Sequence, residues 1–307
     1  MNATASVVEG RFRGAPAVTL TAGDLSATFL PDIGMTGVSL RWRDCEHLAL
    51  PGGLPALRAG STLGLPLLAP WANRLAGRRY RAAAVDVDLT GMAVPVDGNG
   101  LPMHGLLVGR PGWRVELGAV RRGRATLRAA IDVDEPAFPF PHRIEVTATA
   151  GDRRLTIDTT VTPTGRRTVP VAFGWHPYLR LPGTPRRDWR LRLPARTHVA
   201  LDERGIPTCA EASERAETEP IGARTFDDLY VLGRGRTLAL ESGDCSVEMT
   251  AGAGYSCAQV WVPRGRPFAA LEPMVAPTNA LSNGATPLVE PGDAYSASFT
   301  LAVGNHP

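Results

Sequence analysis

The chain has 307 residues, and its 33 basic residues are all arginine, because no lysine occurs in the sequence. This absence excludes a Schiff-base enzyme, which needs a side-chain amine, and a Walker A phosphate loop, which needs its lysine. With 30 acidic residues the net charge is only +3. The arginines are scattered rather than clustered in a basic stripe, so we expect no nucleic-acid partner.

The N-terminal residues show no basic region followed by an apolar stretch, which argues against a secretory signal peptide. No apolar run approaches the roughly 20 residues that a membrane helix needs. The four cysteines are far apart and none forms C-x-x-C, so their spacing predicts no metal site. We therefore expect a cytoplasmic protein with no membrane partner.

Short segments of alternating apolar and polar residues recur along most of the chain. Residues 51–70 precede them and are too rich in Pro and Gly for a central strand, so we expect an ordered loop there. In the alternating segments the apolar residues recur with a period of two, which predicts half-buried strands. These strands are expected within residues 115–117, 127–131, 144–148, 153–162, 238–240, 247–249, 260–262 and 295–303. Residues 203–219 show no apolar stripe, and we expect a loop with one short turn.

Strand follows strand at a spacing of mostly about ten residues, which is typical of sandwiches and barrels. Helical signals are scarce, no internal repeat of fixed period occurs, and no long polar linker divides the chain. The sequence therefore predicts a single all-β domain over residues 1–307.

Two histidines occur in unusual company. His176 lies in A-F-G-W-H-P-Y-L-R-L (172–181), where Pro177 biases it toward extended backbone. His104 lies in G-N-G-L-P-M-H-G-L-L (98–107), beside a glycine that permits close backbone approach. Each could be a functional imidazole at the end of an element, or a structural histidine with satisfied hydrogen bonds.

The acidic candidates are Glu272 and Asp227. Glu272 stands in F-A-A-L-E-P-M-V-A-P-T-N (268–279), at the end of an apolar run. Burial there would raise its pKa toward that of a useful base; alternatively, the carboxylate anchors the following loop through backbone N–H groups. Asp227 and Asp228 are neighbours on an expected strand, so their side chains should point to opposite faces.

Asn73 and Arg74 complete the candidate set. They lie in W-A-N-R-L-A-G-R-R-Y (71–80) and offer forked hydrogen-bond donors beside aromatic side chains. Aromatic faces rimmed by Asp, Asn and Arg are typical of a carbohydrate site. No G-x-S-x-G nucleophile motif occurs. Taken together, the residues indicate acid–base chemistry on a sugar.

These motifs, in this order, resemble those of the aldose 1-epimerase (galactose mutarotase) family. The matching segments are P-W-A-N-R-L-A-G-R-R-Y (70–80), M-H-G-L-L (103–107), F-G-W-H-P-Y-L-R-L (173–181), L-D-E-R-G-I-P-T (201–208), F-D-D-L-Y (226–230) and A-L-E-P-M-V-A-P-T-N-A (270–280). The resemblance implies one large antiparallel β-sandwich, the galactose mutarotase-like supersandwich. It also implies an isomerase that interconverts the α and β anomers of a free aldose such as glucose or galactose.

The resemblance further implies a role for each candidate residue. Glu272 would be the general base and His176 the general acid, with no cofactor and no covalent intermediate. His104, Arg74 and Asp227 would bind the monosaccharide, and Asn73 would line the site. Two departures from the family pattern predict changes: Trp175 should narrow the pocket, and Thr278 should weaken an anchor of the loop after Glu272.

Other functions remain open from the sequence. A hexose 6-phosphate 1-epimerase would need a basic cluster, for which Arg78, Arg79 and Arg180 are available. A sugar-binding module without turnover would need neither an acid nor a base. A glycosidase would need two carboxylates roughly 5–10 Å apart, such as Glu272 and Asp227. The protein could be a monomer or a homodimer.

Overall fold

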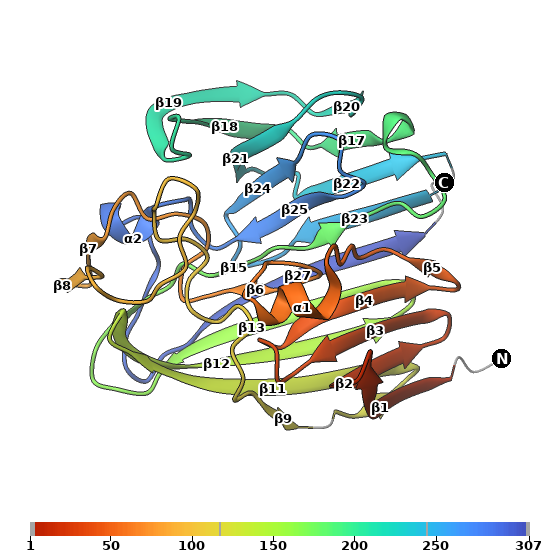
Figure 1. Ribbon diagram of the computed structural model, residues 1–307, viewed down its shortest axis with the longest axis horizontal. Coiled ribbons are helices and arrows are strands. Elements are labelled where there is room, and N and C mark those ends of the chain that lie inside the picture. The colour runs from red at the N-terminus through yellow and green to blue at the C-terminus, as the bar shows by residue number, and fades with distance from the viewer. Residues whose placement is uncertain (1–3, 117, 244, 305–307) are drawn as a thin grey trace.

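The structure is a computed structural model that describes residues 4–116, 118–243 and 245–304. Antiparallel sheets account for most of these residues, as Figure 1 shows. The all-β fold class predicted from the sequence is confirmed. Leu117, which we expected in a strand, lies outside the described residues.

Three large sheets form within the described residues. The first, of five strands, has the order β1 (Ala5–Phe12), β2 (Ala15–Ala22), β3 (Leu25–Leu30), β4 (Thr36–Trp42) and β5 (Cys45–Glu46). The second, of ten, has the order β10 (Val120–Arg121), β11 (Arg124–Glu135), β12 (Phe138–Gly151), β13 (Arg154–Pro163), β27 (Tyr295–Gly304), β23 (Cys245–Ala251), β22 (Thr237–Ser242), β17 (Arg190–Leu193) and β20 (Glu217–Pro220), with β9 (Arg114–Glu116) beside β11. The third, of eight, has the order β19 (Pro207–Glu214), β18 (Arg196–Leu201), β21 (Phe226–Leu232), β24 (Cys257–Val262), β25 (Ala269–Met274), β15 (Gly174–Trp175) and β6 (Leu67–Leu68), with β16 (Tyr178–Leu179) beside β25.

The remaining elements are short. Two small ladders pair β7 (Arg79–Ala82) with β8 (Val85–Asp88) and β14 (Val169–Pro170) with β26 (Leu288–Val289). The helices are α1 (Gly53–Arg58), α2 (Ala280–Asn283) and the 3₁₀ turn η1 (Arg186–Asp188).

The sheets pack as two layers. Strand β2 of the five-stranded sheet contacts β11 and β12 of the ten-stranded sheet, and β25 of the eight-stranded sheet contacts β23. Isolated antiparallel bridges join the five- and eight-stranded sheets at Gly37–Leu65 and Leu48–Leu179. These two sheets therefore continue each other in one layer that covers the ten-stranded sheet, which is the architecture of a sandwich.

The alternation seen in the sequence places the core between the layers. Along β12 every second side chain is buried, including Phe138, Phe140, Ile144 and Val146. Each such side chain contributes roughly 1.5–3 kcal/mol when it leaves water. The opposite face carries polar residues, so one register of the strand is strongly preferred.

Three expectations are corrected. Residues 203–219 are mostly strand rather than loop, because β19 and β20 pair with β18 and β17 as edge strands. Their mostly exposed side chains explain the missing apolar stripe. Residues 51–70 contain α1 and the short strand β6 in addition to loop. The sequence-predicted strands also omitted β1–β5, which form a complete sheet.

Candidate active site

Neighbouring strands of the eight-stranded sheet bring the acidic candidates together. Strands β21, β24 and β25 lie side by side (Figure 1), and their register pairs Asp227 with Trp261 and Gln259 with Glu272. His176 follows β15, which pairs with the other edge of β25. Residues about 100 positions apart in sequence thus meet over the middle of one sheet.

His176 and Glu272 contact each other directly. Nε2 of His176 lies 3.2 Å from Oε1 of Glu272, and the two side chains are only 6% and 2% exposed. The imidazole stacks on Tyr178 at 4.5 Å between ring centroids and meets the edges of Trp261 and His104. These aromatic contacts leave the imidazole little freedom to turn away from the carboxyl group.

Burial dominates the electrostatics of this pair. It raises the pKa of Glu272 well above its usual value; Asp227 raises it further, and Arg74 opposes the rise. Burial and the neighbouring His104 lower the pKa of His176 well below its usual value. Both shifts disfavour the charged forms, so over a wide pH range the two groups together hold one proton, which their contact allows them to share.

Several buried polar atoms around the pair are unpartnered. Oε2 of Glu272, Nδ1 of His176, Nδ1 of His104 and Oε1 of Gln259 have no hydrogen-bond partner among the residues that the structure describes. Buried polar atoms are normally hydrogen-bonded, because leaving them unpaired costs about 1–3 kcal/mol each. Four such atoms in neighbouring side chains are suited to a ligand that carries several hydroxyl groups.

His104 and Asn73 lie in two different loops, and both residues have a left-handed backbone conformation. The φ of His104 is 63° and that of Asn73 is 52°, and the His104 N–H donates to the Asn73 carbonyl at 2.9 Å. At Gly105 a Cβ atom would lie 2.2 Å from the carbonyl oxygen of Ala69, so only glycine permits this approach. Burial and Arg74 lower the pKa of His104 to about 3, which keeps the imidazole neutral.

Arg74 occupies the side of the site next to Asp227. Its Nε donates to Oδ2 of Asp97 at 2.8 Å, and its Nη2 lies 3.7 Å from Oδ2 of Asp227. The other oxygen of Asp227 accepts a hydrogen bond from Gln259 Nε2 at 2.7 Å. Asn279 fixes the loop, because its N–H donates to the Arg74 carbonyl and its Oδ1 accepts the Ala76 N–H.

All six sequence-predicted site residues therefore lie in one connected group. Glu272, His176 and His104 are in mutual contact or close proximity, Arg74 and Asp227 border them, and Asn73 is buried and supports His104 through its carbonyl. Asp228 instead contacts Nε2 of His198 at 3.2 Å, so the two adjacent aspartates have different partners.

The sequence reasoning missed Gln259 and Asp97. Gln259 is a buried polar residue inside the apolar run C-A-Q-V-W-V, which is a signal that could have marked it. Asp97 sits in D-G-N-G and accepts the N–H groups of Asn99 and Leu101. Burial acts to raise its pKa, but these bonds and the one from Arg74 together lower it, so it is an ionised anchor for Arg74.

Trp175 and Thr278 are the two positions at which a departure from the family pattern was expected to change the site. The Trp175 indole donates to Thr159 Oγ1 at 3.1 Å and packs against Phe299 in the core, so the expectation that it narrows the pocket is wrong. Thr278 is buried, and the loop is tied to the rest of the site through the neighbouring Asn279.

The arginines considered for a phosphate have separate partners in the structure. Arg79 pairs with Asp88 at 2.9 Å, and Arg78 donates to the Leu89 carbonyl. The backbone N–H of Arg180 donates to the carbonyl of His47 at 2.9 Å. The guanidinium groups of Arg78 and Arg79 are therefore both engaged with β8 and the residue that follows it.

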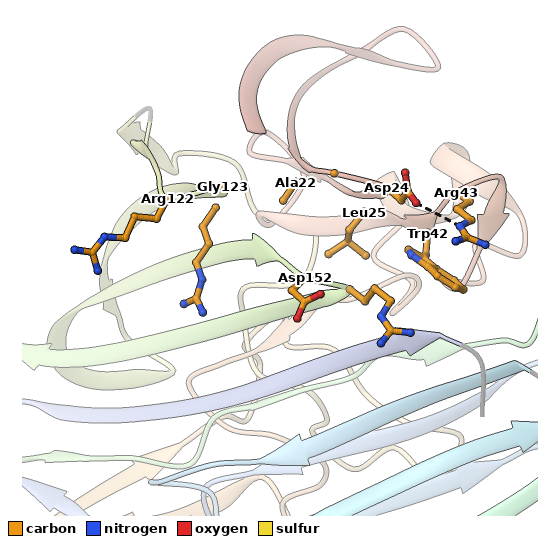
Figure 2. Close-up of a pocket in the computed structure, with 11 residues that line it drawn as sticks. Ala22, Asp24, Leu25, Trp42, Arg43, Arg122, Gly123 and Asp152 are labelled. Carbon is orange, nitrogen blue, oxygen red and sulfur yellow. Dashed lines mark hydrogen bonds and ion pairs between the residues drawn. The ribbon is translucent and has the colours of Figure 1, made fainter. Parts of the chain in front are cut away.

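Cavities border the site on one side and occur elsewhere on the surface. One of about 440 Å³ is lined by Arg74 and Asp227 together with residues of the β18–β19 turn. Another of about 970 Å³ lies between hairpin turns, where Figure 2 shows Trp42, Asp152 and the Asp24–Arg43 pair. None of the six site residues lines this larger cavity.

Across residues 4–116, 118–243 and 245–304, no three His, Cys, Asp or Glu side chains are grouped so as to hold a metal ion. In the same part of the chain, no helix has the length and apolar character needed to cross a membrane.

The fold and the site define a β-sandwich protein with a buried carboxyl–imidazole pair beside hydrogen-bonding groups. The sequence profile of the aldose 1-epimerase family matches residues 16–302. The chain belongs to this family. None of the curated protein sequences compared with the chain matches it.

Solved structures share the fold at low sequence identity. A galactose mutarotase-like protein from Clostridium acetobutylicum has a TM-score of 0.85 and 18% identity, with 98% of this chain and 99% of that chain covered. Galactose 1-epimerase from Lactobacillus acidophilus has a TM-score of 0.81 and 12% identity, with 99% and 100% covered. The GalM/aldose epimerase homologue from C. elegans has a TM-score of 0.77 and 16% identity, with 99% and 100% covered. At these identities the likeness establishes the fold alone.

Proposed function

We propose that the protein is an aldose 1-epimerase that interconverts the α and β anomers of a free aldose such as glucose or galactose. The observation that carries this proposal is the 3.2 Å contact between His176 Nε2 and Glu272 Oε1, with an unpartnered polar atom left on each side chain. Membership of the aldose 1-epimerase family supports the same reaction.

The chemistry needs one proton taken and one proton given. Opening a cyclic hemiacetal removes a proton from the C1 hydroxyl and delivers one to the ring oxygen. Glu272 takes the first proton and His176 gives the second, so the C1–O5 bond breaks and an aldehyde forms. After rotation about C1–C2 the roles reverse, and closure on the other face of the carbonyl yields the second anomer.

The shared proton makes this cycle self-contained. Ring opening starts with His176 protonated and Glu272 ionised, and it ends with His176 neutral and Glu272 protonated, because His176 gives its proton to the ring oxygen while Glu272 takes the proton of the C1 hydroxyl. Ring closure reverses both transfers. Burial favours the neutral pair, with the proton on Glu272, which is the form that accompanies the open-chain aldehyde.

The remaining residues hold the sugar. His104, neutral because its pKa is lowered to about 3, hydrogen-bonds the substrate near the reacting end. Arg74 and Asp227 bind hydroxyl groups, with Asp97 fixing the plane of the guanidinium. Asn73 lines the site and supports His104. A module that only binds sugar would gain nothing from burying an acid–base pair, because burying charge-bearing groups destabilises the fold.

Polarimetry tests the proposal. Freshly dissolved α-D-glucose and α-D-galactose should reach their equilibrium rotation faster with the protein than without it. His176→Asn should lose most of this acceleration, because general acid–base groups contribute about 10²–10⁴-fold. Unchanged rotation rates with folded wild-type protein would reject the proposed activity.

A further inference from the structure

A cavity of about 970 Å³ lies where four hairpin turns of the sandwich meet. These turns connect β2 to β3, β4 to β5, β10 to β11 and β12 to β13. Two of them belong to the five-stranded sheet and two to the ten-stranded sheet. Both layers of the sandwich therefore contribute to a cavity that none of the six candidate active-site residues lines.

Arginine is the commonest residue around this cavity. The charged side chains that line it are Arg43, Arg122, Arg124, Arg153, Asp24 and Asp152. Arg43 and Asp24 pair with each other at 3.3 Å. Within the part of the chain that the structure describes, the other three arginines form no ion pair and donate no side-chain hydrogen bond. Three unpaired positive charges therefore share the cavity with one unpaired carboxylate.

The fold brings together arginines that are far apart in the sequence. Arg122 and Gly123 form the two-residue turn between β10 and β11, and Asp152 and Arg153 form the one between β12 and β13. All four residues have a positive φ, between 42° and 74°. Two-residue hairpin turns follow a defined backbone path, so the Cα positions of both arginines are fixed although their side chains are exposed.

Trp42 gathers two guanidinium groups from different sheets. The Cζ atoms of Arg43 and Arg153 lie 4.6 Å and 5.7 Å from the centroid of its ring, and such cation–π contacts restrict long side chains. The Arg153 guanidinium also lies against the backbone of Gly304, where a Cβ would be 3.0 Å from Nη1. Like charges held at one ring repel each other, and an anion that binds both relieves this repulsion.

The arrangement of the charges favours an elongated anion over a compact one. Figure 2 shows Arg122 on one side of the cavity and Trp42 with Arg43 on the other. The volume of about 970 Å³ is close to the upper end of the range of about 300–1,000 Å³ found for small-ligand sites. A single phosphate can contact only one side of this cavity, whereas a chain of linked phosphates can contact both.

We propose that this cavity binds a polyphosphate anion through the guanidinium groups of Arg122, Arg124 and Arg153. A guanidinium group binds phosphate oxygens through two parallel N–H···O bonds and stays charged at every pH of interest. Linked phosphates occur in inorganic tripolyphosphate and in nucleoside triphosphates such as ATP. The Trp42 ring already carries two guanidinium groups, so recognition is of the phosphate chain and not of a stacked base.

Isothermal titration calorimetry of the full-length protein tests this inference, which does not depend on the proposed epimerase function. Wild-type protein should bind one tripolyphosphate per chain, bind ATP with similar affinity, and bind orthophosphate at least about tenfold more weakly. Affinity for tripolyphosphate should fall as the ionic strength rises from about 0.05 to about 0.2 M, because the arginines are exposed and salt screens exposed charges.

Three substitutions in the turns predict changes of opposite sign. Arg122→Gln and Arg153→Gln should each weaken tripolyphosphate binding by about tenfold, because each removes charge-assisted hydrogen bonds. Asp152→Asn should strengthen binding by about threefold, because it removes the opposing charge. Asparagine tolerates the φ of 42° at this position, and a gain in affinity cannot arise from misfolding.

Arg13→Gln is the matched control. Arg13 and Gly14 form a two-residue turn with positive φ at both positions, as Arg122 and Gly123 do, and Arg13 is exposed but does not line this cavity. The control should bind tripolyphosphate as wild type does.

Four results would overturn the inference. They are no binding of tripolyphosphate to wild-type protein, equal affinity for orthophosphate, binding of ATP without binding of tripolyphosphate, and equal losses in Arg13→Gln and Arg122→Gln. Binding that Arg74→Gln abolishes and Arg153→Gln leaves intact would also overturn it, because the anion would then occupy the candidate active site.

Discussion

Replacing Glu272 by glutamine should stabilise the folded protein at neutral pH while removing its activity. The carboxyl group is 2% exposed, and burial raises its pKa well above the usual 4.5. Glutamine has nearly the same shape and cannot ionise. Its amide N–H can replace the carboxyl O–H as a donor toward His176, so the variant keeps the packing and loses only the titration.

The size of the effect follows from proton linkage. In the unfolded chain Glu272 ionises above pH 4.5, whereas the raised pKa keeps it protonated in the folded protein. Unfolding then releases a proton, so the free energy of unfolding falls as the pH rises from 4.5 toward the raised pKa. The fall is up to about 1.4 kcal/mol per pH unit for one group. Glu272→Gln abolishes this contribution, so its advantage over wild type should grow with pH.

Urea denaturation of wild-type and Glu272→Gln protein at several pH values between about 5 and 8 measures the difference. Glu211→Gln is the control, because it makes the same substitution at an exposed position of β19. The free energy of unfolding of this control should follow wild type at every pH. A stability difference between Glu272→Gln and wild type that stays constant with pH, or favours wild type increasingly as pH rises, would refute the argument that Glu272 is buried as the neutral acid.

Three further predictions concern the groups around the pair. Gly105→Ala should lower the free energy of unfolding by more than about 1 kcal/mol in urea denaturation, whereas Gly100→Ala, also at positive φ but with nothing within 4 Å, should lower it less; equal losses would contradict the close approach described above. Asp97→Asn should raise KM more than it lowers kcat, because it loosens Arg74, and an unchanged KM in rotation assays would contradict this. The His104 ring should show no titration by NMR between about pH 5 and 8, because its pKa is lowered to about 3; a midpoint near 6.5 would show that the imidazole is solvated.

Much of the central sandwich could be predicted from the sequence, because its strands alternate strictly. In β12 and β13 buried residues alternate with more exposed ones, most of the buried residues are apolar, and this repeat can be recognised in the sequence. Residues 203–219 were misjudged because edge strands such as β19 bury little on either face, so pairing with β18 rather than burial holds them. An exposed strand leaves no hydrophobic pattern to detect.

The site was predicted only as far as local motifs reach. His176 and Glu272 stand beside prolines in apolar surroundings, which made both visible. Gln259 escaped notice because its place opposite Glu272 depends on the register of two strands, which no single segment encodes. Asp97 was missed because its role depends on a loop that folds back toward Arg74.

Anomeric exchange at equilibrium tests the central claim most directly. Magnetisation-exchange NMR on equilibrated glucose reports transfer between the α and β C1–H signals without any net reaction. We predict fast exchange with wild-type protein and none above the uncatalysed rate with folded Glu272→Gln. Exchange in Glu272→Gln equal to that of wild type would contradict the claim that the Glu272–His176 pair moves the protons.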